Sequence, residues 1–288
     1  MKRLFIIANW MQGTGLSGGD RIFIELVKRW QLKLNITLFL SKEGSAICRR
    51  HELGKINQQI WASDFMSRWG YFVDILYRTI NSIINVFSVK TVSGDIIFSS
   101  SDFWPDSFPA LILKMRNPEI IWIAGFYLFA PKPWEKYSPY RGKNFLTGLL
   151  YWIVQLPTYY FIHKFSDIVF VTSQPDVDQF ITNSRPKERV IVIRGGVDTV
   201  SAKHYLNSKN VIPPEKRTYD ACFAGRFHYQ KGVLELVKIW KSVCLKSPKA
   251  HLAMIGNGPL SKEVKNLIEK LGLSKNIYLA GFLDGPKK

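Results

Sequence analysis

Short apolar runs rich in β-branched residues alternate along the chain with stretches whose apolar side chains recur every three or four positions. The runs that predict strands are residues 4–8, 36–40, 95–99, 120–124, 167–172, 190–194, 219–224, 250–255 and 277–280. Continuous apolar runs of this kind are typical of parallel strands that are buried on both faces. Because the runs alternate with helical patterns, the sequence predicts a doubly wound α/β fold.

Three stretches show the helical spacing clearly. One runs from residue 233 to 244, and another begins at Ser261 and ends at Gly272. In the third, Asp20 is placed to cap a helix whose apolar face is made by Ile22, Phe23, Leu26, Val27 and Trp30. We interpret these faces as core contacts and assign no chemistry to them.

A polar stretch at residues 201–217 divides the chain, and it ends in Pro213-Pro214 before a new strand begins. The sequence therefore predicts two domains, residues 1–205 and residues 206–288. The second starts afresh and stops early, so we expect it to be incomplete and to leave a strand edge exposed. An exposed edge of this kind predicts low stability or dependence on a partner chain.

Lysine and arginine outnumber the acids by 40 to 22, which gives a formal net charge of +18. Such an excess favours partners that carry phosphate, namely nucleotides, nucleic acid or an anionic membrane surface, and we favour the membrane. The three cysteines form no CxxC pair, which suits a reducing compartment. Residues 4–8 are too short for the apolar part of a signal peptide. We expect a cytoplasmic protein at the inner face of the membrane.

Residues 145–162 carry no charge over 18 positions, the lower limit for crossing a bilayer. Pro157, Gln155 and Tyr159-Tyr160 favour instead a helix that lies in the membrane interface or a buried core helix. Aromatic and basic residues are also interleaved between residues 104 and 152. Such a mixture can stack nucleic-acid bases, but beside this apolar run a membrane interface or an acceptor groove fits better. We therefore expect a peripheral membrane contact and no nucleic acid.

A glycine-rich loop follows the first predicted strand and opens the first helix. Backbone N–H groups at a helix N-terminus bind anions, and glycines let a phosphate approach closely. Gly13, Gly15 and Gly18 match the G-x-G-x-x-G dinucleotide pattern, and Glu43 follows the second strand. Residues 9–12 separate the strand from the first glycine, however, where a dinucleotide turn is tight. A nicotinamide-dependent oxidoreductase and a plain flexible loop both remain alternatives.

A second glycine loop, residues 224–232, lies where a strand of the second domain gives way to a helix. Arg226 and Lys231 lie five positions apart in this loop and can both reach one diphosphate, the arginine as a planar fork and the lysine as a mobile charge. A further glycine turn at residues 255–259 ends the next strand on the same edge of the sheet. Together the two loops predict a nucleotide site.

These motifs resemble the donor-binding half of the retaining glycosyltransferase family 4. The resemblance rests on Gly225-Arg226, Lys231-Gly232-Val233, Gly256-Asn257-Gly258-Pro259 and Leu279-Ala280-Gly281-Phe282. The first domain is similar too, in Gly18-Gly19-Asp20-Arg21, in Ser166–Ser173 and in Ile193-Arg194-Gly195-Gly196-Val197-Asp198, where Gly195 replaces the Asn of the family's interdomain turn.

The resemblance implies a GT-B fold, in which two Rossmann-like domains face a cleft and the second is incomplete here. It implies transfer of a sugar from a nucleoside-diphosphate sugar to a glycan or lipid-linked acceptor, with retained configuration, no cofactor and no metal. Arg226 and Lys231 would be catalytic by stabilising charge on the leaving diphosphate. The donor would contact Gly225, Gly256, Asn257, Gly258 and Phe282, and Gly18 and Gly19 would face the donor phosphates or the acceptor.

The sequence departs from the family pattern in two places. Family members carry two glutamates after the segment that aligns with Gly281-Phe282, whereas the last glutamate here is Glu269. Many members also place a histidine after the strand that corresponds to residues 120–124, where this chain reads Gly125-Phe126-Tyr127-Leu128. A non-catalytic sugar-nucleotide-binding remnant is therefore a further alternative.

Two features could suggest a metal site. Asp176-Val177-Asp178 spells the D-x-D of metal-dependent glycosyltransferases, but its position at a helix start predicts acids that complement the helix dipole. The five histidines show no ligand spacing and have no cysteine pair nearby. We expect no metal ligands among these residues.

Overall fold

The computed structural model describes residues 1–12, 16–195 and 199–283. Two compact units are present, Met1–Lys132 with Phe145–Val197, and Pro133–Asn144 with Asp198–Lys288. The segment Pro133–Asn144 thus packs with the second unit although the chain on either side of it belongs to the first. Gly13 and Gly15 of the glycine-rich loop, and Gly196-Val197-Asp198 of the interdomain turn, lie outside the described residues.

The first unit is built on a seven-stranded sheet with the order β3-β2-β1-β4-β5-β6-β7, and every neighbouring pair is parallel. This order confirms the doubly wound topology that the apolar runs predict. The strands are β1 (Arg3–Ala8), β2 (Asn35–Ser41), β3 (Asn57–Ala62), β4 (Ile96–Ser99), β5 (Ile121–Gly125), β6 (Ile168–Val171) and β7 (Val190–Val192).

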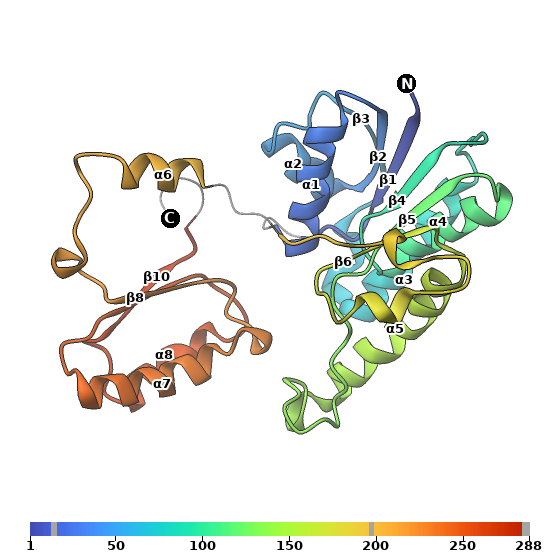
Figure 1. The fold of residues 1–288 in the computed structure, drawn as a ribbon. Coiled ribbons are helices and arrows are strands. Elements are labelled where there is room, and N and C mark those ends of the chain that lie inside the picture. Colours follow the sequence, from blue (N-terminus) through green and yellow to red (C-terminus); the bar gives the residue numbers. More distant parts are fainter. Residues whose placement is uncertain (13–15, 196–198, 284–288) are drawn as a thin grey trace. The chain divides into compact units, whose positions relative to one another are not determined.

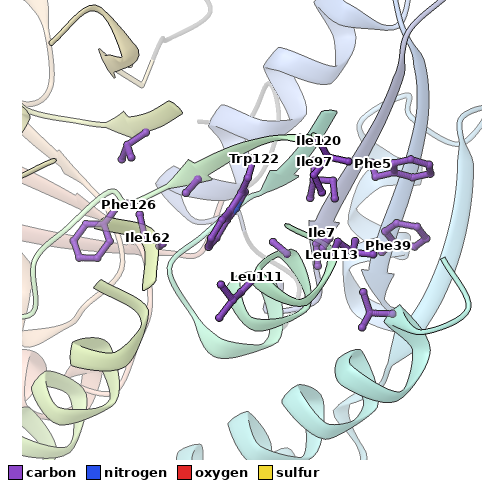
Figure 2. Close-up of a cluster of buried hydrophobic side chains, with 14 of the residues drawn as sticks. Phe5, Ile7, Phe39, Ile97, Leu111, Leu113, Ile120, Trp122, Phe126 and Ile162 are labelled. Atoms are coloured by element: carbon purple, nitrogen blue, oxygen red, sulfur yellow. The ribbon is translucent and has the colours of Figure 1, made fainter. Parts of the chain in front are cut away.

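Helices cover both faces of this sheet (Figure 1). One face carries α1 (Gly18–Trp30) and α2 (Lys42–Arg50), and the other carries α3 (Tyr71–Val86), α4 (Trp104–Arg116) and α5 (Phe145–Phe165). Successive side chains of a strand point to opposite faces, so β1 supplies Leu4 and Ile6 to one core and Phe5 and Ile7 to the other. Figure 2 shows the core beneath α3, α4 and α5, where the indole of Trp122 is fully buried.

Two predictions about the first unit were wrong. The structure contains β3, which the sequence did not predict because it lies at the sheet edge and its first four residues are mostly exposed polar positions. Asp20 is not the cap of α1. Ser17 is the N-cap, and Asp20 is the third helical residue of a capping box, in which each side chain accepts a hydrogen bond from the other's backbone N–H.

α5 is long and apolar enough to cross a membrane by length and composition, and part of it packs on the first unit. Val154, Gln155, Thr158 and Ile162 are buried on one side of this helix. At the C-terminal end of α5, the buried guanidinium of Arg185 donates hydrogen bonds to the backbone carbonyls of Ile162, His163 and Ser166. Burial lowers the pKa of Arg185 to about 10, while the charges of Asp167 and Tyr159 act to raise it.

The second unit contains three parallel strands in the order β10-β9-β8. They are β8 (Ala221–Ala224), β9 (Leu252–Ile255) and β10 (Ile277–Gly281), accompanied by α6 (Val200–Leu206), α7 (Val233–Lys246) and α8 (Ser261–Lys270). Apolar side chains of α7 and α8 pack on β9 in one core. Within residues 199–283, β8 pairs on one side only, so its other edge has no strand partner there.

Short 3-10 turns join several of these elements. They are η1 (Asp64–Trp69), η2 (Gly142–Asn144), η3 (Val177–Phe180), η4 (Lys187–Arg189), η5 (Pro214–Lys216) and η6 (Tyr229–Lys231).

Candidate functional site

The two glycine loops of the second unit lie against one another at the carboxyl ends of β8 and β9. The Gly225 N–H donates to the carbonyl of Ile255 over 3.0 Å, and the Phe227 N–H donates to the carbonyl of Asn257 over 2.9 Å. The Leu260 N–H donates in turn to the Phe227 carbonyl over 3.1 Å. These backbone bonds bring together the segments that the sequence predicted to form one nucleotide site.

Glycine is required where the loops touch. A Cβ on Gly256 would lie 1.9 Å from the Gly225 carbonyl oxygen, and Gly256 has a φ of +146°. A Cβ on Gly258 would lie 2.4 Å from the Phe227 carbonyl oxygen. Backbone rather than a flexible side chain is in the way at both positions, so the fit has little room to relax. The glycines hold the loops close and leave the strand ends uncovered.

Replacing Gly256 by alanine should therefore damage this unit strongly. We expect the free energy of unfolding to fall by several kcal/mol. An unfavourable φ costs roughly 1–3 kcal/mol, and the Cβ adds a collision with the backbone. Gly272→Ala is the matched control, because Gly272 has a φ of +68° with open space around its missing Cβ. Urea unfolding of both variants measures the difference, and equal destabilisation would contradict the collision.

Arg226 and Lys231 are both exposed beside these turns. Neither charged group has a hydrogen bond or ion pair to another side chain within the described part of the chain. Burial, followed by the charges of Arg226 and Lys231, lowers the pKa of His228. His228 is half-buried within the same loop, beside both of these positive charges.

The rest of this loop is held by the segment Pro133–Asn144. The Gln230 amide donates to the Tyr140 hydroxyl over 2.9 Å, and the Lys143 ammonium lies 6.0 Å from the Tyr229 ring centroid. Burial raises the pKa of Tyr140, while Gln230 and the charge of Arg226 act in the opposite direction. Tyr140 thus adds a hydroxyl next to the predicted phosphate-binding residues.

The remaining donor-site residues lie at the same sheet edge or follow it. Asn257 is exposed, and its side-chain oxygen accepts the Gly258 N–H over 2.7 Å. Phe282 directly follows β10 and is 62% exposed. Both are accessible to a ligand, as a donor-binding role requires.

In the first unit, Gly18 and Gly19 form the first turn of α1, as the sequence predicted. Gly18 is open, with nothing within 4 Å of the position that a Cβ would take, whereas a Cβ on Gly19 would lie 2.9 Å from the Tyr127 ring. The helix start therefore lies against Tyr127, a residue of the loop that follows β5.

Sequence reasoning missed a buried acidic cluster at the carboxyl end of β4. Asp106 accepts hydrogen bonds from the backbone N–H groups of Asn9 (2.6 Å) and Trp10 (3.1 Å). It also accepts from the hydroxyls of Ser100 (3.2 Å) and Ser101 (2.5 Å). Burial raises its pKa to about 7 although all four bonds act to lower it. The run of serines that follows this strand was the signal that could have located it.

Asp102 lies in the same loop. Gln155 of α5 donates to its carboxylate over 2.8 Å, and burial raises the pKa of Asp102 to about 6. Gln155 also binds the backbone of Leu128 and Ala130, so it ties α5 to the loop after β5.

Two polar side chains near this cluster have buried atoms with no hydrogen-bond partner in the described chain. They are the amide of Asn9, which is fully buried, and the hydroxyl of Tyr127. Burial, followed by the charges of Asp20, Asp102 and Asp106, raises the pKa of Tyr127. Buried polar groups are normally satisfied, so these atoms are candidates to bind a ligand.

Glu43, which the dinucleotide pattern would assign to a ribose, has another partner. Its carboxylate forms an ion pair with the Arg78 guanidinium at 2.6 Å, and Arg78 forms a second ion pair with Asp74 at 3.1 Å. Arg78 further donates to the carbonyls of Asn9 and Met11, which holds the start of the glycine-rich loop. This pairing disfavours the nicotinamide alternative.

The D-x-D acids have a local structural setting. Asp176 is the N-cap of η3 and accepts a 2.7 Å hydrogen bond from the Ser173 hydroxyl, while Asp178 lies in the first turn. No cluster of three or more histidine, cysteine or acidic residues suited to a metal occurs among residues 1–12, 16–195 and 199–283.

Solved structures share this fold across nearly the whole chain. HepE of Anabaena in complex with UDP-glucose has a TM-score of 0.56 and 16% identity, and the match covers 99% of this chain and 70% of HepE. A mutant of S. aureus TarM, in complex with Fondaparinux, alpha-GlcNAc-glycerol and UDP, has a TM-score of 0.61 and 10% identity, covering 98% and 78% of the two chains. This likeness identifies the fold as GT-B.

Sequence comparisons find similarity to glycosyltransferases over parts of the chain. Residues 206–288 match the family described as Glycosyl transferases group 1. An uncharacterized glycosyltransferase of Methanocaldococcus jannaschii is 27% identical over 159 residues, which are 54% of this chain and 38% of that protein. The poly(glycerol-phosphate) alpha-glucosyltransferase of Bacillus subtilis is 28% identical over 120 residues, 42% and 17% of the two chains.

The chain has the GT-B fold, and its residues 206–288 are similar to the family described as Glycosyl transferases group 1. It spans less than half of the length of the two curated relatives that it matches.

Proposed function

We propose that the protein is a retaining glycosyltransferase that moves a hexose from a nucleoside-diphosphate sugar to a glycan or lipid-linked acceptor. The observation that carries the proposal is the pair of glycine turns at the carboxyl ends of β8 and β9, beside which Arg226 and Lys231 present charges with no side-chain partner in the described chain. Accessible backbone N–H groups of glycine turns and two cations, placed at the carboxyl edge of a parallel sheet, are suited to bind a diphosphate.

The two cations have a direct role in the reaction. As the bond between the anomeric carbon and the diphosphate oxygen breaks, negative charge grows on the leaving group. The Arg226 fork and the Lys231 ammonium stabilise that charge more in the transition state than in the bound donor, which lowers the barrier. Because these residues supply positive charge, the proposal needs neither a divalent metal nor another cofactor.

Relatives support the class of donor and acceptor. HepE is described in complexes with UDP and UDP-glucose, and the Bacillus subtilis relative is named as a glucosyltransferase. TarM is described with UDP and an amino-sugar glycerol compound. A uridine diphosphate sugar is therefore the first donor to test.

On the acceptor side, the proposal assigns the acceptor hydroxyl to the carboxyl edge of the first unit, near Gly18, Gly19 and Tyr127. The buried Asn9 amide and the Tyr127 hydroxyl lack partners among the described residues, so an acceptor would satisfy them. Tyr127 lies in the segment where many family members carry a histidine. The acceptor oxygen forms the new bond to the anomeric carbon, and its proton leaves with a base or the departing diphosphate.

A nucleotide titration tests the proposal. Calorimetry of this chain with UDP, GDP and ADP should give saturable binding to one diphosphate. The nucleotide that binds most tightly identifies the nucleobase of the donor. Turnover is then assayed with the matching sugar donor. NADH fluorescence serves as the control for the nicotinamide alternative. Binding without turnover would favour a sugar-nucleotide-binding protein, and no binding to any diphosphate would contradict the donor site.

We also propose that the protein works in polysaccharide assembly at the cytoplasmic face of the membrane. The net charge of +18 and the apolar outer side of α5 support this location.

A further inference from the structure

α3 has its polar and apolar faces reversed relative to an ordinary surface helix. Its buried side carries the polar residues Asp74, Arg78, Thr79 and Ser82 beside the apolar residues Ile75 and Val86. Arg78 is fully buried and bonds Asp74, Glu43 and the backbone of the loop after β1. These polar residues are thus needed inside, and several apolar residues of the helix are left exposed on its outer side.

The outer side of α3 and the preceding turn η1 form an apolar surface, which we call the η1–α3 surface. Its large apolar side chains are between 41% and 65% exposed. They are Phe65, Trp69, Phe72, Val73, Ile80 and Ile84, and Phe87 follows directly after the helix. Isolated exposed apolar residues are ordinary, but a continuous stripe of this size marks an interaction surface.

Cations stack on the aromatic residues at both ends of this surface. The Arg68 guanidinium lies 5.3 Å from the Phe65 ring centroid and 5.8 Å from that of Trp69, and the Arg116 guanidinium lies 5.7 Å from Phe87. Residues 64–87 contain two acids: Asp74 is buried and paired, and Asp64 is exposed at the start of η1. An apolar stripe flanked by aromatic residues and arginines is complementary to an anionic lipid surface.

We propose that the η1–α3 surface binds the surface of an anionic lipid bilayer. With 16 residues, α3 is too short to span a bilayer and suits a helix that lies in the plane of the interface. α4 packs between α3 and α5, and α5 exposes Leu146, Leu150 and Ile153, so the same helical layer extends the apolar area. Figure 1 shows these three helices on one face of the sheet.

The η1–α3 surface lies next to the edge of the sheet at which the acceptor is proposed to bind. Tyr71, the first residue of α3, makes an edge contact with Trp10, at 5.5 Å between ring centroids, just after β1. The membrane-bound end of α3 therefore adjoins the carboxyl edge of the sheet, where a lipid-linked acceptor would be bound. Lipid binding itself is independent of the proposed sugar transfer and can be tested without it.

Vesicle co-sedimentation tests the proposal on the full chain. We expect the protein to bind vesicles of equimolar phosphatidylcholine and phosphatidylglycerol, and to bind pure phosphatidylcholine vesicles more weakly. The double variant Ile80→Gln/Ile84→Gln should bind the anionic vesicles at least about tenfold more weakly, because two inserted apolar side chains are lost. Both side chains are exposed, so the thermal unfolding of this variant should match that of the wild type.

The matched control is Leu32→Gln/Leu245→Gln, which removes two side chains that are 80% and 74% exposed outside this surface. It should bind vesicles as the wild type does. Trp69 provides a second measurement, since the blue shift of tryptophan emission on vesicle addition should shrink in Trp69→Phe. Equal vesicle binding by wild type and the Ile80/Ile84 variant would overturn the proposal. So would failure of the wild type to bind vesicles, and analytical ultracentrifugation would then reveal whether this surface joins two copies of the chain instead.

Discussion

Arg226→Ala is expected to lower kcat/KM for sugar transfer by about 10²–10³-fold, the size that a lost charge-stabilising donor costs other enzymes. Lys231→Ala should have an effect of similar order. Both side chains are exposed, so neither replacement should change the thermal stability of the protein. Steady-state assays with the donor found by titration measure the effect. Lys238→Ala is the matched control, because Lys238 is an exposed lysine on α7 of the same unit.

Arg226→Lys separates charge from geometry. Lysine keeps the charge but loses the planar fork, so we expect activity between that of the wild type and that of Arg226→Ala. If Arg226→Ala and Lys231→Ala retain full activity with every diphosphate sugar that the wild type uses, the assignment of these residues to the leaving group is wrong. If they lose nucleotide binding together with activity, ground-state binding accounts for part of their role.

Arg78→Met is expected to destabilise the first unit by about 3–5 kcal/mol, because it leaves two buried carboxylates without their cation. The Arg78 side chain is fully buried, and those of Asp74 and Glu43 are 3% and 14% exposed. Urea unfolding measures the loss. Arg29→Met is the matched control, since Arg29 makes an exposed pair with Glu25 on α1 and should cost less than about 0.5 kcal/mol.

A compensated variant tests whether the unpaired carboxylates cause this loss of stability. Arg78→Met combined with Asp74→Leu and Glu43→Met removes the whole ionic group, so it should recover much of the stability that the single replacement loses. If the triple variant is less stable than Arg78→Met, then the carboxylates contribute through other contacts, such as the hydrogen bond from Gln12 to Asp74.

The two glycine loops of the second unit were predictable because their chemistry is local. Gly225 and Gly256 directly follow apolar runs, Gly258 lies two residues further on, and the carboxyl ends of parallel strands meet at one edge of a sheet. The positions of Arg226 and Lys231 follow from the same rule. The acidic cluster was not predictable in this way, because Asp106 is bound by the backbone of Asn9, which lies 97 residues earlier in the chain.

The sequence by itself determined the class of fold, the strands whose two faces are both buried, and the two glycine loops of the second unit. These features follow from short-range periodicity or from a glycine next to a strand, and both patterns depend only on residues that are close in the sequence. Tertiary structure alone decided that β3 joins the sheet, that Glu43 pairs with Arg78, and that α3 turns its apolar side outward. A polar stripe is buried when distant partners satisfy it, and no local pattern records which partners those will be.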